Sequence, residues 1–378
     1  MSQKLKLFLF AFGLADLTVG LVTTGYLWYR RITNIPKKIV EKPEISLTAT
    51  PTPDPLASYS ILLMGYGGAG HEGGKLTDSM MVVRVEPRNN NITLISIPRD
   101  LWVKIPISGE TTLDSKINAA YAIGSDDKKY TNKQPQFTGK TGGGELAKEV
   151  VSEVTGFKIN YFAALDFRGF IKIIDILGGI EVKVEKTFDD SKYPIESEMV
   201  DNCGKSDDEI AALTATMSGE KLEDQFPCRY ETLHFDKGVQ HMDGTTALKY
   251  ARSRHSPTDG GDFNRAARQK AILMSVKEKV VDFGFISKII PTVKTLTRNL
   301  TTDIDLTKLN ELINNAAELA NYKITSIALT DKNVLIDAKS ADGQYILLPR
   351  AGAENWEEVQ QFINNPASLT PTVIPGEQ

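Results

Sequence analysis

Residues 59–98, YSILLMGYGGAGHEGGKLTDSMMVVRVEPRNNNITLISIP, contain the three short apolar runs that decide the fold. The runs YSILLMG, SMMVVRVEP and ITLISIP are each bounded by turn residues, a pattern typical of buried β-strands. Residues 87–91 separate the last two runs and predict a hairpin-like connection. Helical stretches and further strands alternate after residue 98 without a fixed repeat period. We therefore expect an α/β fold, a three-layer α/β/α domain with a central mixed sheet.

The later elements are expected from apolar periodicity and turn residues. Helices are predicted at residues 116–123, 143–155, 167–177, from 243, at 262–281, 285–297 and 306–320 and around Trp356, and strands from Ile180, at 323–329 and at 345–348. The polar segment 189–236 shows little periodicity and is interpreted as an inserted loop. With that insertion, residues 58–365 form one predicted domain, followed by a flexible tail at 366–378.

The N-terminal part of the chain has a different composition. Residues 7–29 form an apolar run long enough to cross a bilayer of roughly 30 Å as a helix. Asp16 in its middle would cost roughly 3 kcal/mol on insertion, which the apolar flanks can tolerate. A cleaved signal peptide is the alternative, but no small-residue cleavage pattern follows, so an uncleaved transmembrane helix after a short segment at 1–6 is favoured. Residues 30–57 contain five prolines and several threonines, which predict an extended linker.

Composition and cysteine content narrow the class of protein. The chain has 378 residues, 41% of them hydrophobic, which is enough for a globular core. Its formal net charge of -4 argues against a nucleic-acid binder, whose phosphate contacts need a basic face. A disulfide between Cys203 and Cys228 is expected if this part of the chain lies outside the membrane, and two free thiols are the alternative. Their spacing excludes a zinc site or a CxxC redox site.

Residues 250–270, YARSRHSPTDGGDFNRAARQK, concentrate arginines around a Gly-rich turn. Guanidinium groups match phosphate oxygens two at a time and stay charged, so a phosphate-bearing ligand is one interpretation. Ordinary surface ion pairs are the other, because solvated charge clusters are common. Arg265, Arg268 and Gln269 have helical spacing and should share one face of a helix. The candidate residues are Arg252, Arg254, Arg265, Arg268 and Gln269.

The segment GYGGAG at residues 65–70 matches the G-x-G-x-x-G pattern of dinucleotide-binding turns and follows a predicted strand. Such a turn must open a helix, whereas this one leads directly into the next strand, so a nucleotide site is rejected. What remains is a Gly-rich loop at the carboxyl end of a strand. It is either part of a ligand site or a permissive surface loop.

Two aspartates lie at the ends of predicted strands, Asp78 in TDS and Asp100 in IPRD. The hairpin would bring their carboxylates together, where they could hold Mg²⁺ against a pyrophosphate or act as a base. Turn capping is their alternative role. Lys116 and Asn118 would meet an anion at the start of a helix. The four histidines have no zinc spacing and no GxSxG elbow is present, so zinc chemistry and a serine nucleophile are unsupported.

Taken in order, these motifs resemble those of the LytR-CpsA-Psr family of bacterial envelope proteins. The matching segments are LTDSMMVVRVEP, ITLISIPRDLWVKIP, KINAAYAIG, DILGGIEVKV, LKYARSR and DFNRAARQ, from about residue 59 to about residue 362. The resemblance implies a phosphotransferase of the bacterial cell membrane, single-pass, with its N-terminus inside and its catalytic domain outside. Such enzymes move a glycopolymer phosphate from a polyprenyl pyrophosphate carrier to peptidoglycan, often with Mg²⁺.

The same resemblance implies roles for individual residues. Pyrophosphate binding is implied for Arg99, Lys116, Arg252, Arg254, Arg265 and Gln269. Arg268 is added to this set because it belongs to the same helix face. Catalytic roles are implied for Asp78, Arg99 and Arg254. Asp100 is added as an alternative base because the hairpin would place it beside Asp78. Asp78 would act as metal ligand or base, with Asp100 as a second candidate metal ligand. The family's polyprenyl chain is thought to lie in an apolar tunnel, for which the helix at 167–177 is a candidate wall.

One departure from the family pattern affects the expected metal site. Where many members have an aspartate soon after the first strand, this chain has Tyr66 and Gly67. One expected ligand is therefore missing, and Asp100 or His71 would have to replace it.

The expected partners are a polyprenyl-linked glycopolymer, peptidoglycan and the cytoplasmic membrane, without nucleic acid or nucleotide. Two other functions stay open. One is a non-catalytic module that binds polyprenyl phosphate or envelope glycan, or acts as a membrane-tethered regulator, which the missing aspartate favours. The other is a pyrophosphatase of lipid carriers.

Overall fold

The computed structural model describes residue 54 and residues 56–366, apart from 72, 282–298 and 315–320. The chain divides into two units, Met1–Asp54 and Pro55–Gln378, and the described residues belong almost wholly to the second. The expected transmembrane helix at 7–29, most of the linker, the helix at 285–297 and nearly all of the tail lie outside the described residues. Within the described part of the chain, no helix is both long and apolar enough to span a bilayer.

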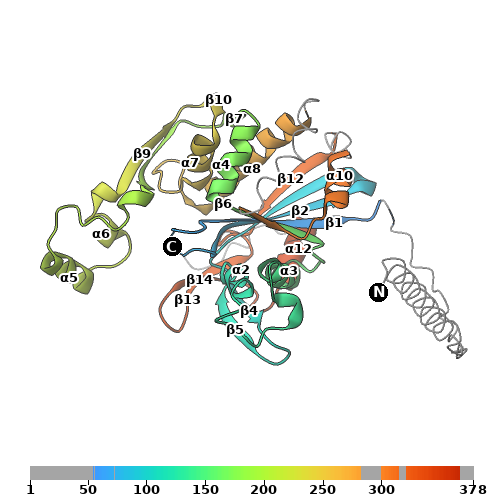
Figure 1. Cartoon of the computed structure of the whole chain (residues 1–378), viewed down its shortest axis with the longest axis horizontal. Helices are drawn as coiled ribbons and strands as arrows, with labels where there is room; N and C mark the ends of the chain where they lie inside the picture. Colours follow the sequence, from blue (N-terminus) through green and yellow to red (C-terminus); the bar gives the residue numbers. More distant parts are fainter. Residues whose placement is uncertain (1–53, 55, 72, 282–298, 315–320, 367–378) are drawn as a thin grey trace, which may run out of the picture. The chain divides into compact units, whose positions relative to one another are not determined.

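A six-stranded mixed sheet forms the centre of the described unit (Figure 1). Its strands, in spatial order, are β11 (Leu300–Thr302), β6 (Tyr161–Asp166), β1 (Tyr59–Tyr66), β2 (Thr77–Glu86), β3 (Asn91–Ile97) and β12 (Lys323–Ala328). The pairs β1–β2, β2–β3 and β11–β6 are antiparallel, and β1–β6 and β3–β12 are parallel. The predicted hairpin is confirmed, because the short helix η1 (Pro87–Asn89) and left-handed Asn90 join β2 to β3. The predicted α/β fold with a central mixed sheet is likewise confirmed.

Helices lie on both faces of this sheet (Figure 1). On one face, α2 (Ala119–Gly124), α3 (Gly142–Thr155) and α12 (Glu357–Asn364) pack with the sheet in the largest hydrophobic cluster. On the other lie α4 (Phe167–Ile176), α7 (Gly244–Arg252) and α8 (Gly261–Val281). Side chains such as Leu62, Ile95 and Phe162 are fully buried, and each such burial stabilises the fold by roughly 1.5–3 kcal/mol. The packed sheet therefore fixes the positions at which the loops at its edges begin and end.

One edge of the sheet collects the predicted motifs. Because β1, β3 and β6 point the same way and β2 runs against them, the ends of β1, β3 and β6 meet the start of β2. The Gly-rich loop after Tyr66, the TDS motif, the IPRD motif and the start of α4 consequently lie at this edge. In open α/β sheets, ligands bind beyond the carboxyl ends of the strands, which makes this edge the place for a site.

Four two-stranded ribbons and a further helix also belong to the described part. The ribbons are β4 (Trp102–Pro106) with β5 (Thr112–Lys116), β7 (Ile180–Val184) with β10 (Gly238–Met242), β8 (Phe188–Pro194) with β9 (Tyr230–Phe235), and β13 (Leu335–Lys339) with β14 (Tyr345–Pro349). The helix is α10 (Leu306–Asn314). The predicted helices at 143–155, 167–177 and 262–281 and the predicted strands from Ile180, at 323–329 and at 345–348 are confirmed within one or two residues.

Two local predictions were wrong. Lys116 was expected at the start of a helix, but it is the last residue of β5, and α2 begins at Ala119. The reason is tertiary, since residues 112–116 pair with β4, and strand formation depends strongly on such a partner. The segment 189–236 was expected to be a loop. Its two ends instead form the ribbon β8–β9, and the part between them contains helix α5 (Asp207–Thr216).

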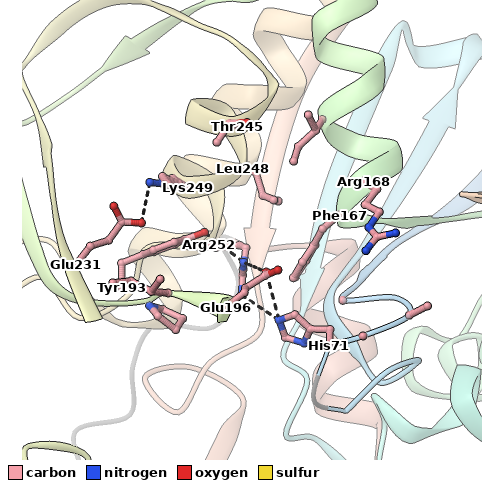
Figure 2. A pocket seen from close by; sticks show the side chains of 16 residues that line it. His71, Phe167, Arg168, Tyr193, Glu196, Glu231, Thr245, Leu248, Lys249 and Arg252 are labelled. Carbon is pink, nitrogen blue, oxygen red and sulfur yellow. Dashed lines mark hydrogen bonds and ion pairs between the residues drawn. The ribbon is translucent and has the colours of Figure 1, made fainter. Parts of the chain in front are cut away.

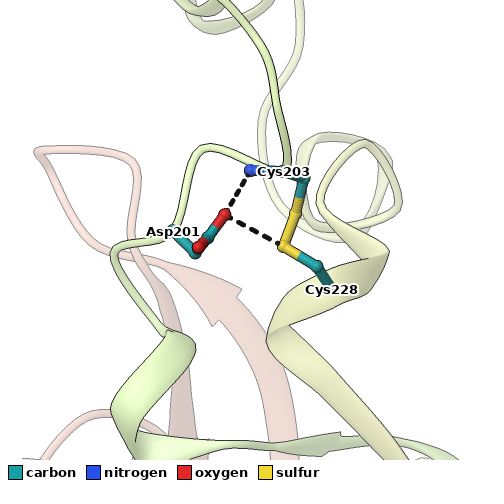
Figure 3. A group of neighbouring side chains, drawn as sticks. All are labelled: Asp201, Cys203 and Cys228. Carbon is teal, nitrogen blue, oxygen red and sulfur yellow. Dashed lines mark hydrogen bonds between the residues drawn. A yellow bond between two sulfur atoms is a disulfide. The ribbon is translucent and has the colours of Figure 1, made fainter.

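We call residues 195–229, between β8 and β9, the arm. Cys203 and Cys228 form a disulfide within it, with their Cα atoms 5.6 Å apart (Figure 3). A capping box between Ser206 and Glu209 starts α5, which has no buried residue. The arm therefore extends away from the core and is fastened mainly to itself.

Candidate functional site

Main-chain hydrogen bonds join three of the predicted motifs. Thr77 N and Oγ1 donate to Asn118 O at 3.2 and 3.3 Å, and Asn118 N donates to Arg99 O at 3.4 Å. TDS, IPRD and KINAA are thus held together at the sheet edge although they are far apart in the sequence. These hydrogen bonds fix the backbones of the three motifs, and therefore their side chains, relative to one another.

The side chains of these motifs form a carboxylate–cation cluster of Asp78, Arg99, Asp100 and Lys116. Arg99 bridges the two acids, with Nη1 3.0 Å from Asp78 Oδ1 and Nε 3.4 Å from Asp100 Oδ2. Lys116 Nζ donates to Asp100 Oδ1 at 2.7 Å. The side chain of Asp100 is 11% exposed and that of Asp78 is 36% exposed. The cluster is formally neutral and open to solvent on the Asp78 side.

The second group of predicted residues lies around α7. Asp243 caps this helix by accepting a hydrogen bond from Thr246 N at 2.7 Å, and the helix ends at Arg252. Arg252 points into a cavity of about 280 Å³ (Figure 2). The cavity is small beside the ~300–1,000 Å³ of common ligand sites, so it suits a headgroup rather than a whole large ligand.

Arg252 is held firmly in this cavity. Its guanidinium lies 4.1 Å from the centre of the Phe167 ring and 5.4 Å from that of Tyr193. Its Nη1 donates to the Tyr193 hydroxyl at 3.2 Å and to Glu196 Oε1 at 3.1 Å, and its Nη2 lies 3.4 Å from His71 Nε2 (Figure 2). Stacking on aromatic rings fixes the plane of an arginine and leaves its edge for an anion.

The cavity has one polar side and one apolar side. Lys249 Nζ pairs with Glu231 Oε1 at 2.7 Å on the polar side. Phe167 and Ile171 of α4 and Leu248 of α7 form the apolar side. The predicted wall helix at 167–177 therefore contributes side chains to a cavity that also contains an arginine. Such a combination suits a ligand with an anionic head and an apolar chain.

The Gly-rich loop reaches from the carboxylate–cation cluster to this cavity. It leaves β1 at Tyr66, carries His71 to the cavity, and returns to antiparallel β2, without a helix among its described residues. A side chain at Gly67 would place its Cβ 2.4 Å from His71 Cγ. The His71 imidazole thus fills the space that a side chain at position 67 would occupy. Its edge also contacts the Phe167 ring, with the ring centres 5.2 Å apart.

The structure corrects the expectation for Arg268. This residue is 2% exposed, and its guanidinium faces the protein. Nη1 donates to the carbonyl and carboxylate of Asp259, both at 2.9 Å, and Nη2 donates to Ser253 O. Helical spacing predicted that it shares one face of the helix with Arg265, but its side chain turns toward the loop that precedes α8. Arg265 and Gln269, four residues apart on α8, stay partly exposed. Arg268 therefore stabilises the loop between α7 and α8 and does not offer its guanidinium to a ligand.

Asp190 is a buried structural residue next to the site that the sequence did not reveal. It is 1% exposed and accepts hydrogen bonds from Ser253 Oγ at 2.7 Å, Arg254 N at 2.9 Å and His255 N at 3.1 Å. Burial opposes its ionisation, but these bonds and one from Lys192 N outweigh burial and hold the pKa of Asp190 below its ordinary value. Asp190 thereby fixes the loop between α7 and α8 that carries Arg254. Nothing in the sequence distinguishes it from its exposed neighbour Asp189.

An Asp190→Asn variant should be less stable by about 1–3 kcal/mol at neutral pH, because a neutral amide replaces a buried carboxylate that accepts several bonds. A lowered folded-state pKa contributes stability that is complete above the unfolded value near 3.9 and is lost as pH falls through the folded value. The difference between the two proteins should therefore shrink below about pH 4. Urea unfolding at pH 7 and pH 3.5 measures it, and an equal difference at both pH values would contradict the assignment.

Comparisons with known proteins identify the family of this chain. The LytR_cpsA_psr family model matches residues 29–359. The chain belongs to the LytR-CpsA-Psr family. Among curated LytR-CpsA-Psr relatives, the polyisoprenyl-teichoic acid–peptidoglycan teichoic acid transferase TagV of Bacillus subtilis is 27% identical over 322 residues, which are 84% of this chain and 67% of TagV. The corresponding transferase TagU of Bacillus cereus is 25% identical over 298 residues, 78% of this chain and 75% of TagU.

A solved structure of the same family extends the likeness to the fold. The crystal structure of B. subtilis TagV superimposes with a TM-score of 0.52 at 26% sequence identity. The match covers 84% of this chain and 99% of that structure. The central mixed sheet and its flanking helices are thus those of a LytR-CpsA-Psr domain.

Proposed function

We propose that this chain is a membrane-anchored phosphotransferase that moves a glycopolymer phosphate from a polyprenyl pyrophosphate carrier to peptidoglycan. Membership of the LytR-CpsA-Psr family and the names of its teichoic acid transferase relatives support this proposal. The observation that carries it is the Arg252 cavity, where a fixed guanidinium lies beside an apolar wall from α4 and α7. A lipid pyrophosphate has the matching chemistry, with an anionic head and an apolar chain.

Positive side chains would bind the pyrophosphate and stabilise the charge that develops during transfer. We assign this role to Arg99, Lys116, Arg252, Arg254, Arg265 and Gln269, and leave Arg268 out because it is buried against the protein. An acceptor hydroxyl on peptidoglycan attacks the phosphorus next to the glycan. The new P–O bond forms as the bridging P–O bond breaks, and the polyprenyl monophosphate leaves with the electron pair.

The acceptor hydroxyl must lose its proton as it attacks. Asp100 accepts hydrogen bonds from both Arg99 and Lys116, which fix the position of its carboxylate. Asp78 pairs with Arg99 and is the more exposed of the two carboxylates. Asp78 is therefore the better placed to meet a hydroxyl from solvent, and we assign it the role of base.

We include Mg²⁺ in the proposal, and the donor set fits it. Mg²⁺ is commonly held by one or two carboxylates together with phosphate oxygens of the substrate. Asp78 and Asp100, bridged by Arg99, would supply the carboxylates. When bound, the cation would neutralise part of the pyrophosphate charge. Asp100 is favoured over His71 as the replacement for the missing aspartate, because His71 Nε2 faces Arg252 and Glu196.

The location is also part of the proposal. A helix at 7–29 with its N-terminus in the cytoplasm would anchor the domain on the outer side of the membrane, where carrier-linked glycopolymer and peptidoglycan meet. The disulfide in the arm suits an oxidising compartment outside the cytoplasm.

Mass spectrometry of lipid that co-purifies with the detergent-extracted full chain tests the proposed ligand. We expect polyprenyl phosphate or pyrophosphate with the wild-type protein and much less with Arg252→Ala. Absence of any polyprenyl phosphate under conditions that retain other membrane lipids would count against the proposal.

A further inference from the structure

The arm contributes one carboxylate to the Arg252 cavity. Glu196 Oε1 accepts a hydrogen bond from Arg252 Nη1 at 3.1 Å and lies 3.5 Å from His71 Nε2 (Figure 2). It thus lies where a phosphate oxygen would meet this guanidinium. We propose that Glu196 is a gate residue, an internal carboxylate that occupies the Arg252 site until a phosphate of the substrate displaces it. This inference rests on the proposed function of that site.

The two partners of this ion pair differ in how firmly they are fixed. The Arg252 side chain is 19% exposed and lies between two aromatic rings, Phe167 and Tyr193. The Glu196 side chain is 57% exposed and belongs to the short helix η3 (Glu196–Glu198) at the start of the arm. Ion pairs with an exposed partner are weak. Glu196 is therefore the partner that can leave, and Arg252 stays in position to receive the phosphate.

Internal bonds hold the arm together as one unit. Its two ends are joined by a hydrogen bond from Ile195 N to Arg229 O at 2.8 Å, and Arg229 Nε donates to Asp201 O at 2.7 Å. The disulfide between Cys203 and Cys228 closes it further out. These bonds lie within the arm, and its helix α5 buries no residue against the domain. The ribbon at its base also shifts register between Asp190 and Tyr193, and Tyr193 lies three residues before Glu196.

The negative charge of the arm favours displacement of Glu196 when pyrophosphate binds. The arm contains nine acidic and three basic residues, a formal charge of -6, so the remainder of the chain carries +2. Glu196 therefore brings an acidic segment against a cationic cavity. A pyrophosphate carries more negative charge than one carboxylate and can accept bonds from Arg252 and its neighbours at two positions. Once it binds, the same negative charge repels the arm, which favours the displaced position of Glu196.

The test uses the detergent-solubilised full chain and geranyl pyrophosphate, a probe with the pyrophosphate and a short isoprenoid chain. Calorimetric titration at constant ionic strength should show about three- to tenfold tighter binding by Glu196→Gln, because apparent affinity rises with the fraction of sites that are open. Glu198→Gln is the matched control, since Glu198 lies on the same helix η3 and its carboxylate accepts from Ser197 Oγ. It should bind as the wild type does. Unchanged or weaker binding by Glu196→Gln would overturn the gate.

A third variant separates failure of the gate from failure of the proposed function. Arg252→Ala should lose most binding of geranyl pyrophosphate, both alone and combined with Glu196→Gln. If Arg252→Ala binds as tightly as the wild type, the cavity is not the phosphate site and the proposed function fails. If Arg252→Ala loses binding while Glu196→Gln gains none, the site stands and the gate alone is wrong.

Discussion

We expect Arg99→Ala to lower glycopolymer transfer by about 100- to 1,000-fold, the range found when one donor to a developing charge is removed. Arg99 bridges Asp78 and Asp100 and is itself assigned to the pyrophosphate. Its loss therefore removes a proposed contact with the substrate and also the cation that links the two carboxylates. The measurement is the rate of formation of peptidoglycan-linked glycan by purified protein whose thermal unfolding is unchanged.

Arg88→Ala is the matched control for this substitution. Arg88 lies in η1, between the end of β2 and the start of β3, at the opposite edge of the sheet from Arg99. It should transfer glycan at the wild-type rate. A folded Arg99→Ala protein that keeps half or more of wild-type activity would remove Arg99 from the site.

The second large effect is expected for Asp78→Asn, which keeps the size of the side chain and removes its charge. Transfer should fall by about 100-fold or more, because general bases contribute roughly 10²–10⁴ and the same carboxylate is a proposed Mg²⁺ ligand. Binding of geranyl pyrophosphate without Mg²⁺ should not weaken, since the carboxylate repels rather than attracts phosphate. Single-turnover transfer and equilibrium titration together separate the chemical role from binding.

Asp114→Asn provides the comparison for Asp78→Asn. Asp114 is an exposed acid on β5, two residues before Lys116, and pairs across the ribbon with Lys104 of β4. It should leave the rate unchanged. If Asp78→Asn and Asp114→Asn transfer equally well, Asp78 is neither base nor required metal ligand.

Sequence alone was sufficient where local pattern and tertiary structure agree. The runs at 59–98 have a clear apolar pattern and adopt the three neighbouring strands β1, β2 and β3. Because adjacent antiparallel strands bring their opposite ends together, the meeting of Asp78 with Arg99 and Asp100 follows from the hairpin. The arginine segment 250–270 likewise lies across the end of α7 and the start of α8, as its spacing indicated.

What the sequence did not reveal depends on contacts between distant segments. Arg265 and Arg268 have the same chemistry, yet Arg268 is buried against Asp259 because of the way the loop before α8 folds back. Asp189 and Asp190 are adjacent acids, and the alternation of a strand turns one outward and the other toward Ser253. Glu196 meets Arg252 only because the ribbon β8–β9 places the arm there. Such pairings carry no local signal.

The central claim is most directly tested by a transfer reaction with purified components. The full chain is incubated in detergent and Mg²⁺ with a polyprenyl pyrophosphate-linked glycan and peptidoglycan fragments, and the products are analysed by mass spectrometry. We predict glycan joined to peptidoglycan through one phosphate, with polyprenyl monophosphate released in equal amount and neither product formed at a significant rate by Arg99→Ala. A stable complex with no product would indicate a binding module. Release of phosphate that does not require an acceptor would indicate a pyrophosphatase, and either result would contradict the proposed transfer.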